Sequence, residues 1–247
     1  MPIEHEIPID GQTISAIHHE TDGDRWILFC HGFRSDKTGS YESRCERAVE
    51  EGYNAVRFDF RGSGESGGAF VESTLTTRIA DLRAVIGHVD PSSYALFGSS
   101  FGAKVAFHAA ARAGRTSETV EPTAIVARAP VTYNRAFDAY RETVDSEGVL
   151  RYDGDHAIDR RFFDDFDAYS FDEGAAVLDV PIAIFHGSDD ESVPIDDTFE
   201  AAAALDTDVL VGKYAGEGHR FSATAEDRLR TQAFDWLGTV WPPAGSR

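Results

Sequence analysis

Short apolar runs alternate with segments of helical periodicity along most of this chain of 247 residues. The runs are rich in β-branched and aromatic residues, which predicts strands. Between two of them, residues 75–89 place their apolar side chains on one face, as an amphipathic helix does. Strands that alternate with helices favour an α/β fold, in which helices flank both faces of a mostly parallel central sheet. The predicted strands are TISAI (13–17), WILFC (26–30), NAVRFDF (54–60), YALFG (94–98), TAIVARA (123–129), IAIFHG (182–187) and DVLVGKY (208–214).

One segment, residues 131–178, breaks this alternation. It holds nine of the chain's 28 aromatic residues together with many acidic ones. We interpret it as a small cap inserted into a single domain that spans residues 1–247. Two roles stay open for its rings, which could form the cap's own core or line a binding site for an apolar or aromatic acyl group. These rings include Tyr133, Phe137, Tyr140, Tyr152, Phe162, Phe163 and Phe166.

The charge balance is strongly acidic, with 43 Asp and Glu against 23 Lys and Arg and a formal net charge of −20. Such a surface repels phosphate backbones, so we expect no nucleic-acid partner. The N-terminus lacks the pattern of a secretory signal and no apolar run could span a membrane, which predicts a soluble, cytoplasmic protein. Two interpretations of the charge stay open, an ordinary acidic protein and a halophilic one, and scarce lysine favours the second. The only lysines are Lys37, Lys104 and Lys213, and the only cysteines, Cys30 and Cys45, are expected to be plain thiols.

The sequence FGSSFG follows a predicted strand and precedes a predicted helix. A serine lifted off a strand end on a very tight turn adopts a strained backbone, so the residues two before and two after it must be small. Around Ser100 these positions are Gly98 and Gly102, whereas around Ser99 both are phenylalanine. The amides of the following helix also favour negative charge near this turn. Ser100 is therefore the candidate nucleophile.

A serine hydroxyl needs a base, and the base needs an orienting carboxylate. Downstream of Ser100, the sequence HGSDDESVP supplies an acid after one strand, and GEGHRF supplies His219 after the last strand. Small residues before His219 leave room for its ring to enter a site. Most other histidines have plainer interpretations: His5, His18 and His19 are expected to be exposed, and His88 and His108 to lie on helices.

Several motifs occur in an order that resembles the α/β-hydrolase superfamily over nearly the whole chain. They are HGF, FDFRGSGES, FGSSFG, HGSDDESVP and GEGHRF. The resemblance implies that Asp190, not Asp189, is the orienting acid. It also implies that the amides of Phe33 and Phe101 form an oxyanion hole. The arginine after His219 departs from many members, which affects the expected substrate more than the triad.

Within the superfamily, the chain is similar to small esterases of the cinnamoyl or feruloyl type. The resemblance implies a serine esterase in which Ser100, His219 and Asp190 act on a small-molecule carboxylic ester without a cofactor or a metal. A peptidase or a thioesterase of the same fold stays an alternative, as does a non-catalytic binding protein. The sequence leaves the oligomeric state open, a homo-oligomer included, and indicates no membrane partner.

The stretch GSGESG, residues 62–67, also matches the glycine pattern of a dinucleotide-binding loop. Such a loop must open a helix at once and needs an acidic residue at the end of the next strand. Here the helix begins only near residue 75, and Asp81 at the right separation lies within that helix. We therefore expect no nucleotide cofactor at this loop.

The charge count generates a prediction about salt. Raising KCl from low to molar concentrations should raise both the melting temperature and the activity, because screening weakens the repulsion among carboxylates. Thermal melts across the salt series measure the effect, and a flat or falling melting temperature would contradict the halophilic interpretation.

Overall fold

Eight strands form one central sheet in the computed structural model, which describes residues 1–113 and 120–243. The strand order is β1-β2-β4-β3-β5-β6-β9-β10, and all pairs from β4 to β10 are parallel, as the sequence predicts. Among the described strands of this sheet, the β1–β2 and β2–β4 pairs are antiparallel. The strands are β1 (Ile3–Ile9), β2 (Gln12–His19), β3 (Arg25–Cys30), β4 (Tyr53–Phe58), β5 (Ser93–Ser99), β6 (Ala124–Arg128), β9 (Ile182–Gly187) and β10 (Val209–Tyr214).

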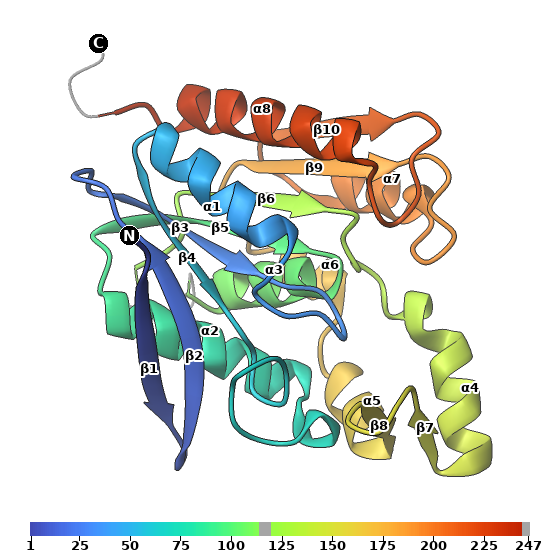
Figure 1. The fold of residues 1–247 in the computed structure, drawn as a ribbon. Coiled ribbons are helices and arrows are strands. Elements are labelled where there is room, and N and C mark those ends of the chain that lie inside the picture. Colours follow the sequence, from blue (N-terminus) through green and yellow to red (C-terminus); the bar gives the residue numbers. More distant parts are fainter. Residues whose placement is uncertain (114–119, 244–247) are drawn as a thin grey trace.

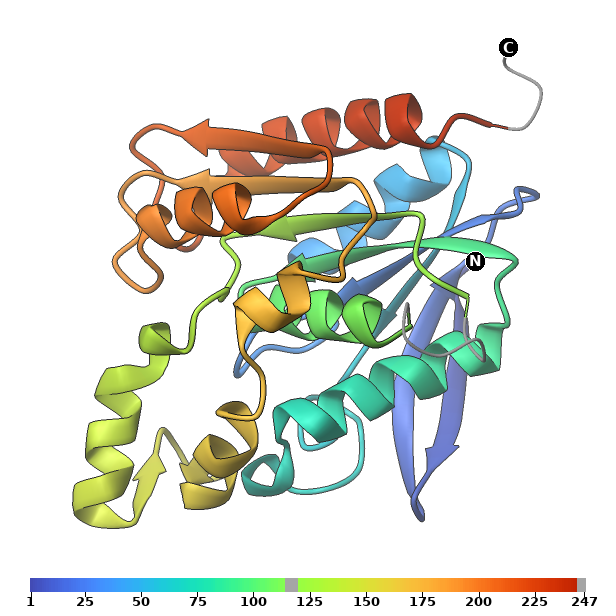
Figure 2. The ribbon, with the colours of Figure 1, turned by 180° about the vertical axis from the view of Figure 1, so that it is seen from behind.

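Helices cover both faces of this sheet (Figures 1 and 2). On one face lie α1 (Ser40–Glu50) and α8 (Ala223–Val240), whose buried residues share a core with β3, β4 and β5. The other face carries α2 (Leu75–Val89), α3 (Phe101–Ala113), α6 (Phe171–Ala175) and α7 (Ile195–Ala204). The predicted helix over residues 75–89 is confirmed with the same bounds. No helix in the described ranges has both the length and the apolar character needed to cross a membrane.

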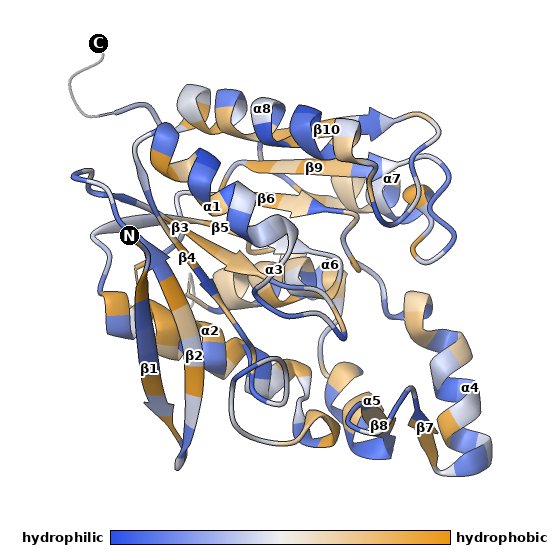
Figure 3. Ribbon diagram, viewed as in Figure 1, coloured by the Kyte–Doolittle hydropathy of each residue, from blue (hydrophilic) through white to orange (hydrophobic). Residues whose placement is uncertain are grey.

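The central strands are hydrophobic along most of their length, whereas hydrophobic and hydrophilic residues alternate along β1 and β2 (Figure 3). Every residue of β4 and of β9 is buried, because helices cover both of their faces. In contrast, β1 lies at the sheet edge and buries mainly Ile7. The hydropathy of each strand therefore reflects its place in the sheet.

The edge strand β1 is missed by the sequence interpretation, which begins the sheet at residue 13. Its signal is the dipeptide Asp10-Gly11, a typical hairpin turn, with φ of 47° and 75°. The expectation that His18 and His19 are exposed is also wrong, since each is 7% exposed. Both lie on β2, which β1 and β4 flank, and His18 stacks on Trp26.

Residues 131–178 connect β6 to β9 and extend beyond the carboxyl ends of the parallel strands (Figure 1). Much of the segment stands away from the sheet, but its aromatic side chains pack back against the loop after β3 and against the start of α3. Its elements are the 3₁₀ helix η2 (Asn134–Phe137), α4 (Asp138–Glu147), the hairpin strands β7 (Val149–Arg151) and β8 (Ala157–Asp159), α5 (Arg160–Phe166) and α6.

The junction of β5 and α3 brings three backbone segments into very close contact. A Cβ atom on Gly102 would lie 2.2 Å from the carbonyl oxygen of Cys30, at the end of β3. One on Gly98 would lie 2.4 Å from Cα of Ala103. Because the opposing atoms are backbone, a side chain at either position cannot be accommodated by a rotamer change.

We therefore predict that Gly102→Ala lowers the free energy of unfolding by about 3 kcal/mol or more, since α3 must move away from β3. Gly87→Ala is the matched control, because a Cβ atom there meets nothing within 4 Å in the interior of α2. That substitution should raise the free energy of unfolding by up to about 1 kcal/mol. Denaturant unfolding compares the two, and equal effects would refute the packing argument.

Candidate active site

Ser100 lies at the turn between β5 and α3 with φ of 53°, in the left-handed region that non-glycine residues rarely adopt. Two hydrogen bonds fix this backbone. The Ser100 N–H donates to the Arg128 carbonyl at 2.8 Å, and the Val131 N–H donates to the Ser100 carbonyl at 3.1 Å. The strained turn is therefore held by the end of β6 and the residues after it, and it presents the Ser100 side chain beyond the strand end.

The structure brings Ser100, His219 and Asp190 together from three separate loops. His219 Nε2 lies 3.0 Å from Ser100 Oγ, and His219 Nδ1 lies 2.7 Å from Asp190 Oδ2. All three follow the carboxyl ends of parallel strands, the usual position of sites in such sheets. The Asp190 side chain is fully buried, whereas the His219 side chain is 24% exposed. With this order of hydrogen bonds, a base can take the hydroxyl proton while a carboxylate orients its ring.

Asp190 is surrounded by hydrogen-bond donors. Its Oδ1 accepts the N–H groups of Ser192 and Val193, each at 2.9 Å, and its Oδ2 also lies 3.0 Å from His186 Nε2. Burial alone would raise the pKa of this carboxyl, but its hydrogen bonds to His186, His219 and Val193 outweigh burial and lower the pKa below its ordinary value. Asp190 therefore stays ionised beside His219.

Asp189 and Ser99, the two neighbouring residues that the sequence analysis set aside, have other contacts. Asp189 is exposed and accepts a hydrogen bond from the hydroxyl of Ser188 at 2.7 Å. Ser99 is buried, and its Oγ accepts from Arg44 Nη1 at 3.0 Å, while Arg44 also pairs with Glu226 of α8. Ser99 therefore links β5 to α1 and α8.

The loop after β3 passes directly beside Ser100. A Cβ atom on Gly32 would lie 3.4 Å from Ser100 Cβ. The Ser35 N–H donates to the Gly32 carbonyl at 3.3 Å, which closes a turn with Phe33 and Arg34 at its centre. Phe101 is the first residue of α3, so its N–H belongs to the group at a helix start that lacks intrahelical acceptors.

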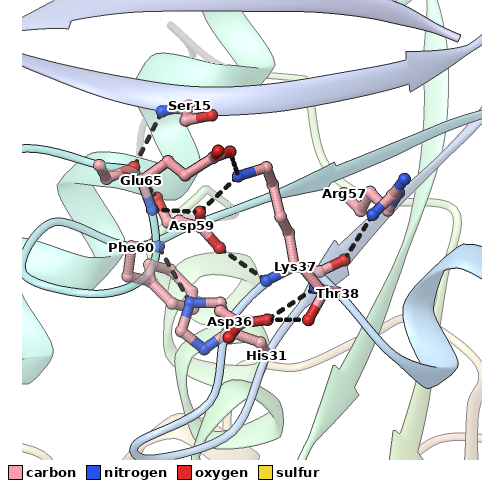
Figure 4. Close-up of polar contacts among 10 residues, drawn as sticks. Ser15, His31, Asp36, Lys37, Thr38, Arg57, Asp59, Phe60 and Glu65 are labelled. Carbon is pink, nitrogen blue, oxygen red and sulfur yellow. Dashed lines mark hydrogen bonds and ion pairs between the residues drawn. The ribbon is translucent and has the colours of Figure 1, made fainter.

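A buried carboxylate, Asp59, holds this loop against the end of β4 (Figure 4). Asp59 Oδ1 accepts the Lys37 N–H at 2.6 Å, and Oδ2 accepts Lys37 Nζ at 2.6 Å and the Glu65 N–H at 2.9 Å. Burial opposes the charge on Lys37, but its hydrogen bonds to Asp59 and Glu65 prevail and raise the pKa of the ammonium group. Arg57 also donates to the Lys37 carbonyl at 3.0 Å.

Two buried histidines support the site, and the sequence interpretation missed both. His31 Nε2 accepts the Phe60 N–H at 3.0 Å and Nδ1 lies 2.9 Å from the Gly32 carbonyl. Burial and the nearby Arg78 lower the pKa of His31 to about 3, so it stays neutral with Nδ1 as donor. His186 lies between Asp190 and Thr198. The available signal is that each histidine precedes a glycine at the end of a predicted strand.

A pocket of about 180 Å³ opens at Ser100 and His219. Phe137 and Tyr140 of the 131–178 segment line it, whereas Phe162, Phe163 and Phe166 are buried against the core. Phe137 belongs to both sets, because its ring lines the pocket and also packs on Phe162 and Phe166 of the buried core. The other lining residues are Phe33, Arg34, Val131, Ala136, Ser192, Val193 and Arg220.

Gly62 and Gly64 of the 62–67 stretch lie in close contact with other atoms of this chain, which leaves no space for a Cβ atom. A Cβ atom on Gly64 would lie 2.2 Å from Asp59 Oδ2, and one on Gly62 would lie 2.6 Å from the backbone nitrogen of Phe70. The next α-helix, α2, begins only at Leu75. Within residues 1–113 and 120–243, no group of three His, Cys, Asp or Glu side chains is arranged to hold a metal ion.

Comparisons with known proteins agree with this architecture. The family model described as serine aminopeptidase, S33, matches residues 21–141. Palmitoyl-protein thioesterase ABHD10 of Pongo abelii is 26% identical over 222 residues, which cover 85% of this chain and 72% of that protein.

Two solved structures share the fold. Mouse α/β-hydrolase domain-containing protein 10 has a TM-score of 0.84 at 18% identity, covering 96% of this chain and 99% of that one. Est1E from Butyrivibrio proteoclasticus with bound ferulic acid has a TM-score of 0.81 at 16% identity, covering 95% and 99%. The resemblance stated from the sequence is confirmed, and the chain has the α/β-hydrolase fold.

Proposed function

We propose that this hydrolase cleaves carboxylic esters through an acyl-enzyme, with Ser100 as nucleophile, His219 as base and Asp190 as orienting acid. The observation that carries the proposal is the continuous chain of hydrogen bonds from Ser100 Oγ through His219 to the buried Asp190 carboxylate. It lies at a strained left-handed turn on the wall of a pocket, where the serine side chain can reach a substrate.

In the first half of the reaction, Ser100 Oγ attacks the ester carbonyl while His219 Nε2 takes the hydroxyl proton. The negatively charged carbonyl oxygen is bound by the N–H groups of Phe33 and Phe101. The bond to the leaving alcohol then breaks, and His219 gives its proton to that alcohol. Asp190 keeps its negative charge throughout and stabilises the protonated imidazole.

In the second half, water replaces the alcohol and His219 Nε2 takes one of its protons. The hydroxide adds to the acyl carbon, the bond to Ser100 Oγ breaks, and the proton returns to Ser100. The products are a carboxylic acid and the free enzyme. The chemistry uses only groups of this chain, with no cofactor.

A thioester is the second candidate substrate, because a relative at 26% identity is a palmitoyl-protein thioesterase. The same nucleophile, base and oxyanion donors would serve either leaving group. Matched oxygen esters, thioesters and aminoacyl amides of one acyl group, assayed side by side, separate the esterase from the thioesterase and peptidase alternatives.

Substitutions of the three proposed triad residues test their assigned roles. Ser100→Ala should lower kcat/KM by at least about a thousandfold, because the atom that becomes acylated is gone. Asp190→Asn should cost less than His219→Ala, since a poorly oriented imidazole still accepts a proton.

Ser99→Ala is the matched control for Ser100→Ala. It should keep activity within a small factor but lower the free energy of unfolding by about 1–3 kcal/mol, since Arg44 Nη1 loses its acceptor. Full activity in Ser100→Ala, or a collapse in Ser99→Ala, would overturn the proposed mechanism.

The oxyanion loop gives a second prediction. Asp59→Asn should destabilise the protein by about 3 kcal/mol, because Lys37 loses its buried counter-charge and keeps only the exposed Glu65. At temperatures where the variant is folded, kcat should fall more than KM rises, since Asp59 holds the loop that carries the Phe33 amide.

A double variant separates the charge effect from a packing effect. Asp59→Asn combined with Lys37→Met should be more stable than Asp59→Asn alone, because no uncompensated charge remains inside. If the change in the free energy of unfolding of the double variant equals the sum of the two single changes, the importance of the ion pair is contradicted.

A further inference from the structure

The charges that line the active-site pocket have the opposite sign to those of the chain as a whole. Arg34 and Arg220 lie on its wall together with Ser100 and His219, and no Asp or Glu is among its described lining residues. The chain has a net charge of −20, so most of its surface repels anions. The pocket is therefore a local cationic site on an acidic protein.

Neither arginine is neutralised by a carboxylate. Arg34 and Arg220 are both exposed, and within residues 1–113 and 120–243 neither forms an ion pair, although other arginines such as Arg61, Arg135 and Arg141 do. The Arg34 guanidinium lies 4.1 Å above the ring of Tyr152, which leaves its N–H groups free for an acceptor in the plane. Arg220 follows His219 directly in the chain.

The backbone at Arg34 adds an independent observation. Its φ is 55°, in the left-handed region where glycine would be free of strain. The residue is central to the turn that carries the Phe33 amide, so the turn itself would favour glycine there. Because the turn would favour glycine at this position, the fold does not explain the arginine, and a functional role of its side chain in the pocket is consistent with the strain.

We propose that Arg34 and Arg220 select anionic substrates, namely esters with a carboxylate in the acyl or the alcohol part. The inference rests on the proposed function and adds the substrate class. Guanidinium groups bind carboxylates through paired, charge-assisted hydrogen bonds. The ester carbonyl would lie at Ser100, with Phe137 and Val131 contacting the apolar part of the substrate.

Matched ester pairs measure the selectivity. In the acyl arm, 4-nitrophenyl hydrogen adipate is compared with its methyl ester. In the alcohol arm, 4-butanoyloxybenzoate is compared with its methyl ester. We expect the wild type to favour the anion in at least one arm, by about tenfold in kcat/KM.

Charge-neutralising variants identify the residues responsible. Arg34→Gln and Arg220→Gln should each reduce the ratio of anionic to neutral kcat/KM by about three- to tenfold. Arg83→Gln is the control for the change in net charge, because Arg83 lies on α2 and lines a different pocket. It should leave the ratio unchanged. A wild-type ratio near one in both arms, or an equal loss in Arg83→Gln, would overturn the proposal.

Binding to Ser100→Ala protein distinguishes this inference from the proposed function. Calorimetry with monomethyl adipate and dimethyl adipate needs no turnover. Tighter binding of the monoanion, lost in the added Arg34→Gln or Arg220→Gln, supports the anion site even if the wild type cleaves no ester. Equal binding of the two compounds would reject the anion site while leaving an esterase mechanism intact.

Discussion

The left-handed turn at Ser100 is the constraint on which the candidate site depends. It can exist only because the backbones of β3, β5 and α3 approach closely at Gly98 and Gly102, where added Cβ atoms would lie 2.4 and 2.2 Å from backbone atoms. The same approach brings the loop after β3 beside Ser100. One packing arrangement thus supplies the position of the hydroxyl, the start of α3 and the neighbouring Phe33 amide.

Two buried carboxylates then fix the loops on either side of this turn. Asp190 accepts backbone N–H groups from its own loop and the ring of His219, and Asp59 accepts the backbone and side chain of Lys37. Each carboxylate meets donors from segments that are distant in sequence, so each replaces its lost hydration with several hydrogen bonds. The loops can therefore be irregular in backbone and still hold a defined geometry.

Local patterns were sufficient for most of the fold and for Ser100 and His219 as candidates, whereas the choice of Asp190 over Asp189 rests on the family resemblance. The spacing of glycines around Ser100 reflects contacts within a few residues, and the bounds of α2 follow from its own apolar face. The contacts of His31 with Phe60 and of His186 with Thr198 join residues whose proximity depends on the tertiary fold. The burial of His18 likewise depends on β1, an edge strand that only the Asp10-Gly11 turn signals.

The distribution of cationic side chains links the stability of the protein to its proposed selectivity. Of the three lysines, Lys37 and Lys104 are buried, so Lys213 is the one lysine left at the surface. Positive charge at the surface comes mainly from arginines. Among the described residues, Arg34 and Arg220 share the lack of an ion pair with other exposed arginines such as Arg228, and they differ from it in lining the pocket at Ser100. Salt that screens the acidic surface would weaken long-range attraction to these two groups, yet direct hydrogen bonds to a bound carboxylate are screened much less. A pocket that binds its substrate through direct hydrogen bonds would therefore keep its preference for anionic esters at the high salt concentrations that stabilise the folded chain.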